Sequence, residues 1–260
     1  MPIRKRFGQH FLHDPLVIER IVVAIAPRRG DALVEIGPGR GALTTPLVSQ
    51  LDTLDAIEID RDLAAQLRAR FAAQAGFHLH EGDALDFDYG ALACERGQRL
   101  RVVGNLPYNI STPLLFRLLK YSPHLQDLHF MLQKEVVDRI VAPPGSRQYG
   151  RLGVMLAPRA RATSLLDIGP GAFTPAPRVS SAVVRLEVLP MPPAWAAEPY
   201  YGAVVTAAFG QRRKTLRNAL SQLLTAAQIA AAGIDPAVRA ETLAPEQFGQ
   251  LALAYQAVIH

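Results

Sequence analysis

The segment Asn105-Leu106-Pro107-Tyr108 combines residue types that could activate an exocyclic amine of a nucleobase. Such an amine is a poor nucleophile, because its lone pair is delocalised into the ring. It must be drawn toward tetrahedral geometry before it can attack a methyl group. The side-chain oxygen of Asn105 and a backbone carbonyl at Leu106 or Pro107 could accept its two hydrogens. Tyr108 offers an aromatic face for stacking, worth about 1–3 kcal/mol per base, and we expect its hydroxyl not to matter. The segment therefore predicts a pocket for a base that has left its stack.

A glycine-rich loop earlier in the chain, Glu35–Gly41, predicts a site for a small ligand. Glycines there let the backbone turn tightly and approach a ligand closely. The spacing Gly37-x-Gly39-x-x-Ala42 also fits the loose dinucleotide pattern. However, Pro38 removes a backbone donor and Glu35 adds a carboxylate, and both features disfavour a pyrophosphate. A cationic or zwitterionic ligand suits the loop better, and S-adenosylmethionine is one, with its ammonium group and its sulfonium.

Polar residues at the ends of successive predicted strands extend this site. Glu58 follows Gly37 by about 20 residues, where a doubly wound fold places a carboxylate that accepts both ribose hydroxyls. Asp83 ends the next strand, suitably placed for an adenine amino group, and Asn105 ends the strand after that. Because open parallel sheets bind ligands at the carboxyl ends of their strands, the set is far more specific than any one member.

The elements that must position these residues alternate between short β-rich runs and helical patterns. The runs predict strands over 32–36, 54–59, 77–80, 101–104 and 127–132, and the patterns predict helices over 16–26, 41–50, 62–71 and 112–121. This alternation predicts an α/β fold with a parallel, doubly wound sheet. The runs at 162–168 and 181–188 are not followed at once by a helix, so we expect antiparallel additions at one edge.

A proline cluster at 190–193 marks a change of character, and such clusters signal linkers. We therefore expect a nucleotide-binding domain over 1–190 and a small all-helical domain over 191–260. The predicted C-terminal helices span 200–209, 212–224, 226–232 and 245–258. The run Gln211–Arg217 has four cations and no acid, so it could follow a phosphate backbone. A solvated helix face is the ordinary alternative. The cations are Arg212, Arg213, Lys214 and Arg217.

The composition excludes several other classes. The 260 residues are 49% hydrophobic and 20% charged, close to globular averages. The single cysteine, Cys94, rules out an internal disulfide and a cysteine-rich metal site, and it favours a reducing compartment. The net charge of +5 fits a polyanionic partner.

No stretch has the pattern of a membrane span or a secretion signal, and the histidines lack metal-ligand partners at useful spacing. We expect a cytoplasmic protein with no metal and no membrane partner.

Several segments, taken in order, resemble those of the bacterial small-subunit ribosomal RNA adenine dimethyltransferases. The segments are Arg6–Leu12, Glu35–Gly41, Gly82–Ala84, Gly104–Pro113, Met131–Glu135, Tyr149–Leu152, Phe173–Val179, Ser181–Leu186 and Phe209–Asn218. The resemblance covers nearly the whole chain. That family uses S-adenosylmethionine to methylate two adjacent adenosines near the 3′ end of 16S rRNA.

The resemblance implies a fold and a set of roles. It implies a Rossmann-like methyltransferase domain with a small helical C-terminal domain, and transfer of four methyl groups, two to each adenine. The cofactor would be held by His10, Leu12, Gly37, Gly39, Glu58, Asp83 and Asn105. The adenine would be held by Asn105, Leu106, Pro107 and Tyr108, with Phe173 as a second aromatic wall. A monomer would act on 16S rRNA within the immature small ribosomal subunit. Arg40 stands where similar proteins often carry an uncharged residue, and its role is open.

Other functions compete with this one. The large-subunit rRNA methyltransferases that confer macrolide resistance look similar through the loop and the motif, but they usually have Ile where Leu106 stands. DNA adenine methyltransferases usually begin the motif with Asp and Pro. A non-catalytic role is a rival from another class, either as a checkpoint in small-subunit assembly or as a nucleic-acid-binding factor on the same fold. Glu58 and Asn105 argue for catalysis instead. An NAD dehydrogenase is disfavoured, because no obvious hydride-site acid or base follows the loop.

Overall fold

The computed structural model describes residues 10–108, 110–196, 199–211 and 213–260, and the chain divides into two compact units. The N-terminal unit comprises Met1–Val137 and Arg161–Pro190, and the C-terminal unit comprises Asp138–Ala160 and Met191–His260. One division falls at the proline cluster. The other differs from the single boundary expected near residue 190, because the segment 138–160 groups with the C-terminal unit.

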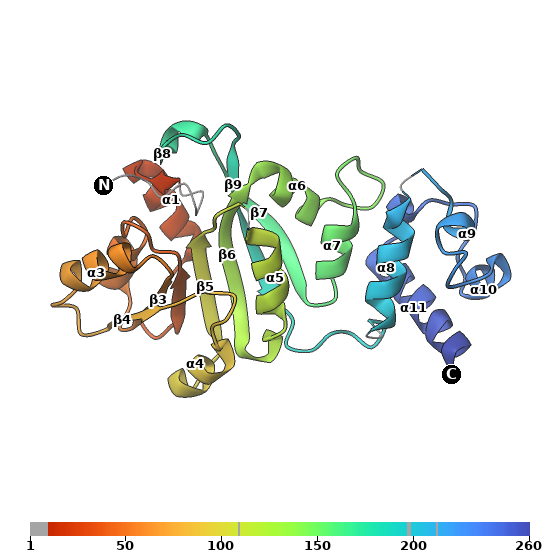
Figure 1. Cartoon of the computed structure of the whole chain (residues 1–260), viewed down its shortest axis with the longest axis horizontal. Helices are drawn as coiled ribbons and strands as arrows, with labels where there is room; N and C mark the ends of the chain where they lie inside the picture. Colours follow the sequence, from red (N-terminus) through yellow and green to blue (C-terminus); the bar gives the residue numbers. More distant parts are fainter. Residues whose placement is uncertain (1–9, 109, 197–198, 212) are drawn as a thin grey trace. The chain divides into compact units, whose positions relative to one another are not determined.

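A seven-stranded sheet in the order β4-β3-β2-β5-β6-β9-β7 forms the centre of the N-terminal unit (Figure 1). Its strands are β2 (Leu33–Ile36), β3 (Leu54–Glu58), β4 (Phe77–Glu81), β5 (Leu100–Asn105), β6 (Leu125–Gln133), β7 (Ala160–Ile168) and β9 (Ser181–Val188). The strands from β4 to β6 run parallel. β9 is antiparallel to β6, and β7 lies beyond β9 at the edge. The predicted doubly wound α/β sheet is therefore confirmed.

β2 is the strand at which the order of the sheet reverses. It pairs with β3 on one side and with β5 on the other. Ligands of open α/β sheets bind beside such a point, outside the carboxyl ends of the strands. Gly104 lets β5 lie against β2 there, because a Cβ at this position would meet the carbonyl oxygen of Ile36 at 2.5 Å.

Helices connect the parallel strands, and aspartates begin several of them. In three helices, the carboxylate of the preceding aspartate accepts N–H groups of the first turn. Asp14 precedes α1 (Pro15–Ile25), Asp60 precedes α3 (Arg61–Arg70) and Asp88 precedes α4 (Tyr89–Arg96). Three more helices each follow a strand: α2 (Thr44–Gln50) follows β2, α5 (Ser111–Leu119) follows β5, and α6 (Lys134–Val141) follows β6. The sequence patterns do not predict α4 or α6.

A separate pair of short strands ties the N-terminal segment to the loop between β7 and β9. β1 (Phe11–Leu12) is antiparallel to β8 (Phe173–Thr174), with Phe11 opposite Thr174 and Leu12 opposite Phe173. Short 3-10 turns lie at Ser122–His124, Pro170–Ala172 and Ala240–Thr242.

Arg101 on β5 anchors α1 to the sheet. Its guanidinium donates to the carbonyl oxygens of Ile25 at 2.6 Å and Ala26 at 3.2 Å, at the end of α1. It also donates to the carboxylates of Asp31 at 2.6 Å and Asp127 at 3.0 Å. A helix leaves its last carbonyls unsatisfied and partly negative, so this buried cation completes α1. The helix that follows the N-terminal strand is thereby fixed.

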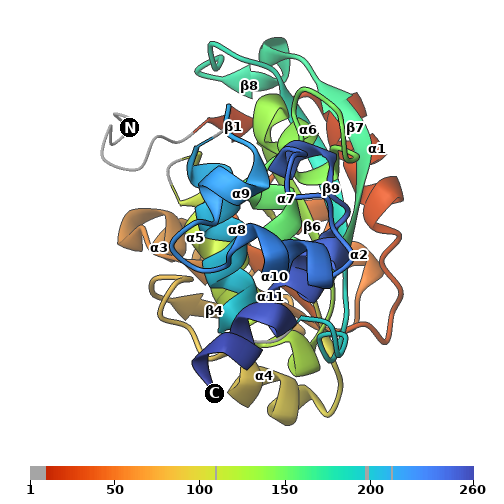
Figure 2. The ribbon, with the colours of Figure 1, turned by 90° about the vertical axis from the view of Figure 1, so that its right-hand side faces the viewer.

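The C-terminal unit is built of helices. They are α7 (Arg151–Leu156), α8 (Tyr200–Gly210), α9 (Leu216–Ala219), α10 (Ala226–Ala231) and α11 (Pro245–Ile259). α8 and α11 lie side by side and share a hydrophobic core (Figure 2). None of the helices in the described part of the chain is long and apolar enough to span a bilayer.

Two buried tyrosines explain why the segment 138–160 belongs to the C-terminal unit. The hydroxyl of Tyr149 donates to the carbonyl of Leu243 at 2.7 Å, and the hydroxyl of Tyr201 donates to the carbonyl of Val154 at 2.9 Å. Both rings lie in the core of this unit. Because these bonds join parts of the chain far apart in sequence, a proline cluster near residue 190 could not predict them.

The helix predicted over 212–224 is wrong. In its place α9 spans only Leu216–Ala219, and Thr215 before it is extended and forms a β-bridge with Arg239. The N–H groups of Leu216 and Arg217 donate to the carbonyls of Val238 and Pro236 at 2.8 and 3.0 Å. Hydrogen bonds to a distant segment therefore replace those of a longer helix.

Replacing Arg101 with Met should destabilise the chain by about 3–5 kcal/mol, because it removes the guanidinium that donates to the buried carboxylate of Asp127. The free energy of unfolding, measured by urea titration, reports the loss. Arg161→Met is the matched control at an exposed position on β7, and it should change stability by less than about 0.5 kcal/mol. Equal stabilities of the two variants would contradict the anchoring role of Arg101.

Candidate active site

A cavity of about 310 Å³ opens at the carboxyl ends of β2, β3 and β5. Sites for small ligands typically measure about 300–1,000 Å³. Most residues expected to hold the cofactor or the base line it, namely His10, Leu12, Gly37, Gly39, Glu58, Asp83, Asn105, Leu106, Pro107 and Tyr108. The structure therefore brings the glycine-rich loop, the strand-end acids and the Asn105–Tyr108 segment to one cavity.

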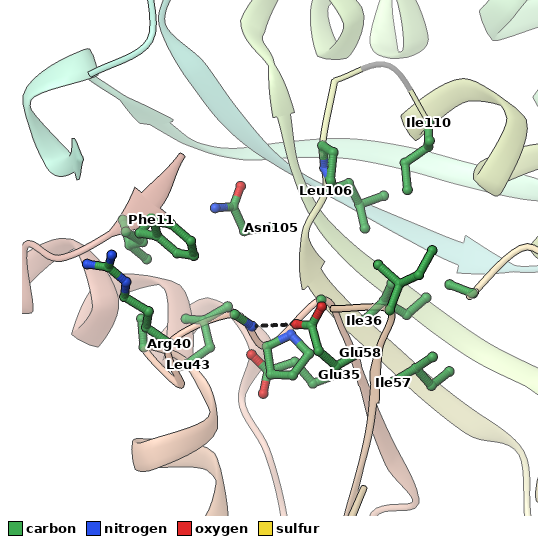
Figure 3. Close-up of a pocket in the computed structure, with 18 of the residues that line it drawn as sticks. Phe11, Glu35, Ile36, Arg40, Leu43, Ile57, Glu58, Asn105, Leu106 and Ile110 are labelled. Atoms are coloured by element: carbon green, nitrogen blue, oxygen red, sulfur yellow. Dashed lines mark hydrogen bonds between the residues drawn. The ribbon is translucent and has the colours of Figure 1, made fainter. Parts of the chain in front are cut away.

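The glycine-rich loop turns sharply where the sequence supplies glycine. Gly37, Gly39 and Gly41 have φ angles of 66°, 58° and 78°, which favour glycine. The N–H of Gly37 donates to the carbonyl of Ile57 at 2.9 Å. The N–H of Gly39 donates to the carboxylate of Glu58 at 3.0 Å, the dashed line in Figure 3. β3 therefore holds the loop that follows β2.

Glu58 ends β3 with both carboxylate oxygens engaged by backbone N–H groups. Oε2 accepts from Gly39 at 3.0 Å and Oε1 accepts from Asp60 at 2.9 Å. Burial raises the pKa of Glu58 above its usual value, and these two N–H groups oppose the rise. Each oxygen has a further acceptor position, and the residue lines the cavity. Glu58 can therefore hold the loop and still accept hydroxyl groups of a ligand.

Glu35 is a second buried acid on the cavity wall. It is 2% exposed and accepts the hydroxyl of Thr44 at 2.7 Å. Burial is the main reason that its pKa rises to about 7, while Thr44 opposes the rise and the charge of Glu58 adds to it. Two buried carboxyl groups on one wall favour a positively charged ligand over a phosphate. In the described ranges, no group of three or more His, Cys, Asp or Glu residues could hold a metal ion.

Asp83 lies just beyond β4, half-buried on the wall of the cavity. Its carboxylate accepts the N–H of Leu85 at 2.9 Å. The buried hydroxyl of Tyr89 donates to the carbonyl of the next residue, Ala84, at 2.9 Å. These bonds fix the turn, and the carboxylate has capacity for another donor such as an amino group.

The side-chain amide of Asn105, at the end of β5, is oriented by the N-terminal segment. Its Nδ2 donates to the carbonyl of His10 at 2.9 Å. In Figure 3 the nitrogen points toward Phe11 and the oxygen points away from it. The Nδ1 of His10 in turn lies 2.7 Å from the carbonyl oxygen of Pro175. With its nitrogen engaged, Asn105 offers Oδ1 to a donor on a ligand.

Leu106 and Pro107 shape the turn after β5. Leu106 is buried, and its N–H donates to the carbonyl of Met131 at 3.2 Å. The carbonyl of Pro107 accepts the N–H of Ile110 at 3.2 Å. Because the Pro107 carbonyl closes the turn, the Leu106 carbonyl is the better of the two candidates for accepting a ligand amine.

Tyr108 lines the cavity with a half-buried side chain. Its ring centroid lies 5.7 Å from that of His10, and the two rings are tilted by 31°. Its hydroxyl lies 3.0 Å from the hydroxyl of Ser181. The expectation that this hydroxyl does not matter took no account of this contact.

Phe173 is buried in the β1–β8 pair. It is 3% exposed, it packs in a hydrophobic cluster with Leu12 and Met131, and it stands opposite Leu12 in the β1–β8 pair. It is absent from the described residues that line the cavity, and its expected role as a second aromatic wall stays a prediction. The register of a two-residue strand decides which way this ring points, and the motif carries no signal of that register.

Arg40 braces the N-terminal strand against the glycine-rich loop. Its guanidinium lies 4.4 Å from the centroid of the Phe11 ring, as Figure 3 shows. Such contacts at exposed sites are worth about 0.5–1 kcal/mol. The guanidinium of Arg70 donates to the carbonyl of Arg40 at 2.9 Å. Arg40, whose role the sequence left open, therefore contacts the chain's own aromatic ring.

The basic run lies in the C-terminal unit, and Arg212 falls outside the described residues. Arg213, Lys214 and Arg217 are exposed. Arg213 stands in the turn before α9 and Arg217 stands within it. A helix over 212–224 would have placed Arg213 and Arg217 on one face, but α9 begins only at Leu216; all three cations are exposed and accessible to a polyanion.

Known proteins are similar to this chain over nearly its full length. A model of the ribosomal RNA adenine dimethylase family matches residues 2–257. A relative from Pseudomonas aeruginosa, named ribosomal RNA small subunit methyltransferase A, is 53% identical over 250 residues, covering 96% of this chain and 93% of its own. A relative of the same name from Methylococcus capsulatus is 56% identical over 240 residues, covering 92% and 93%.

Solved structures share the fold at lower sequence identity. A dimethyladenosine transferase from Plasmodium falciparum has a TM-score of 0.83 at 22% identity, covering 95% of this chain and 98% of that one. The 23S rRNA methyltransferase ErmE has a TM-score of 0.74 at 24% identity, covering 95% and 99%. The Rossmann-like methyltransferase fold with C-terminal helices, expected from the sequence, is confirmed.

Replacing Glu35 with Gln should change how stability depends on pH. The pKa of Glu35 is about 7 in the folded chain, against an ordinary value of 4.5. The folded chain therefore binds more protons in this window, and the stability that Glu35 contributes is lost as the pH rises through it. Gln does not ionise and can still accept from Thr44. Relative to the wild type, E35Q should gain on the order of 3 kcal/mol between about pH 5 and pH 8.

Urea titration of both proteins at the two pH values measures this difference. The buried His129, whose pKa is lowered to about 4 by burial, acts in the opposite direction. Because His129 is present in both proteins, its contribution cancels in the comparison. Parallel stability profiles would show that Glu35 does not titrate in this range.

Proposed function

Because the chain belongs to the ribosomal RNA adenine dimethylase family, we propose that it uses S-adenosylmethionine to methylate the 6-amino groups of two adjacent adenosines near the 3′ end of 16S rRNA. Each adenine receives two methyl groups, four in all. The observation that carries this proposal is a single cavity that contains both the loop held by Glu58 and the oriented amide of Asn105.

The wall of the cavity fits S-adenosylmethionine. Glu58 has acceptor positions for the ribose hydroxyls, and Asp83 has one for the adenine amino group. The buried carboxyl groups of Glu35 and Glu58 complement a ligand that carries an ammonium group and a sulfonium. When bound, the cofactor supplies an electrophilic methyl group. The rest of its proposed site is formed by His10, Leu12, Gly37, Gly39 and Asn105.

Asn105 and Leu106 prepare the target amine for attack. Oδ1 of Asn105 accepts one amine hydrogen and the Leu106 carbonyl accepts the other, which draws the nitrogen lone pair out of conjugation with the ring. Tyr108 stacks on the base, and Pro107 keeps the turn rigid. The amine becomes acidic as it is alkylated, so its proton can leave without a strong base. In-line placement of the amine accounts for most of the rate gain.

The same pocket must serve both adenines and both transfers. An unmethylated amine offers two hydrogens and a monomethylated amine offers one, so the second transfer needs only one of the two acceptors. The side chain of Ile110 lies on the cavity wall and provides an apolar surface for the first methyl group.

The C-terminal unit supplies cations for the RNA contact. Arg213, Lys214 and Arg217 are exposed there, and Arg212 completes the run in the sequence.

The substrate is 16S rRNA within the immature small ribosomal subunit, and the chain acts on it as a monomer, without a metal ion. The cytoplasm is the expected compartment, which suits the exposed free thiol of Cys94.

Replacing Asn105 with Ala should reduce the methylation rate by on the order of 10²–10³, as loss of one well-placed polar group does in other enzymes. The proposed contact strengthens in the transition state, so the maximal rate falls far more than RNA affinity. The measurement is single-turnover methylation of undermethylated small subunits with labelled cofactor, with RNA affinity determined in parallel. The modified bases are then mapped. Near-normal turnover in N105A would overturn the amine-activation mechanism while leaving the family assignment intact.

Replacing both Arg213 and Arg217 with Ala should weaken RNA binding and flatten its salt dependence. The log–log slope should fall by roughly one unit for each RNA phosphate that the variant no longer neutralises. Arg28 and Arg29, which precede β2 and are exposed, provide a control pair with the same loss of charge. If both pairs change the slope equally, the basic run acts only through net charge and not as a binding surface.

A further inference from the structure

The hydroxyl of Tyr108 has a buried partner that its sequence context does not reveal. It lies 3.0 Å from the hydroxyl of Ser181. Ser181 is fully buried and begins β9. Tyr108, by contrast, is half-buried and lines the cavity. A buried hydroxyl on the sheet therefore holds the far end of a ring that the cavity exposes.

The topology brings Ser181 to the edge of the sheet where the proposed chemistry takes place. β9 is antiparallel to β6, so its first residue, Ser181, pairs with Gln133 at the carboxyl end of β6. Asn105 pairs with Met131 on the same strand. The antiparallel strand added to the parallel sheet thus delivers a polar side chain to the turn that follows β5.

Other contacts restrict the same tyrosine. The hydroxyl of Ser111 donates to the backbone carbonyl of Tyr108 at 3.1 Å, and the ring of His10 lies 5.7 Å away. If the Tyr108 ring turned away, the hydroxyl of Ser181 would lose its partner in the protein interior, and burying a polar group without one is unfavourable. The orientation of the ring is therefore set at its backbone and at its hydroxyl.

We propose that Ser181 is a positioning residue for methylation, and that its hydrogen bond to Tyr108 holds the ring in the orientation that stacks on the target base. This proposal rests on the proposed function, in which Tyr108 captures the base. A ring that is already oriented loses less conformational freedom when the base arrives. Loss of the bond should lower the fraction of bound substrate whose base is captured, and hence the rate.

A double-mutant cycle on single-turnover methylation of undermethylated small subunits tests the proposal. The variants are Ser181→Ala, Tyr108→Phe and the two combined. Each single variant should lower the rate by about fivefold to tenfold, the size of one net hydrogen bond. The double variant should be no slower than either single one, because both remove the same bond. A purely structural effect of Ser181 would persist in the Tyr108→Phe background.

Three controls separate the possible causes. Ser122→Ala truncates another buried serine, in the 3-10 turn before β6, and should leave the rate unchanged. Cofactor affinity and urea unfolding, measured on every variant, detect damage to the fold. Tyr108→Ala removes the stacking face itself and should slow the reaction more than Tyr108→Phe.

The outcomes distinguish the positioning role from the function on which it rests. A slow Tyr108→Ala together with an unchanged Ser181→Ala, or rate losses that multiply in the double variant, would overturn the role of Ser181 and leave the stacking role intact. An unchanged rate in Tyr108→Ala would overturn the stacking role, and the positioning role with it. Coupled losses in the cycle, with normal cofactor affinity, would support both.

Discussion

The hydrogen bond from the N–H of Gly39 to the buried carboxylate of Glu58 is the contact on which the cavity depends. It spans 3.0 Å between the loop after β2 and the end of β3. The two strands are parallel neighbours, so their carboxyl ends meet, and an acid at the end of one can reach the backbone of the other's loop. Without this acceptor, the N–H of Gly39 would lose its partner, and the bond from the N–H of Gly37 to the carbonyl of Ile57 would have to hold the loop against β3.

The electrostatics of the cavity follow from the burial of its two acids, Glu35 and Glu58. Glu35 and Glu58 are both nearly inaccessible to solvent, and burial raises the pKa of each carboxyl group. Buried acids of this kind are unfavourable until a cation approaches, so the site favours a positively charged ligand at the expense of its own stability. A phosphate-binding loop on the same fold would need the opposite arrangement, with free N–H groups and no acid nearby.

Elements outside the parallel sheet hold the side of the cavity where we propose that the base binds. The carbonyl of His10 fixes the amide of Asn105, and the hydroxyl of Ser181 fixes the ring of Tyr108. The N-terminal segment is held in turn by β8 and by the contact of Phe11 with Arg40. The parallel strands thus present the functional groups, whereas the added strands and the N-terminal segment set their orientation.

The sequence by itself determined the doubly wound sheet and ten of the residues on the cavity wall. Parallel strands are visible as local runs, and their carboxyl ends share one edge, so Glu58, Asp83 and Asn105 could be grouped before any contact was known. The tertiary structure alone decided the burial of Phe173, the short α9 and the placement of 138–160. It also decided which groups hold Asn105 and Tyr108, whose partners lie 95 and 73 residues away along the chain. Those contacts depend on strand register and on long-range hydrogen bonds, and neither leaves a periodic signal in the residues that make them.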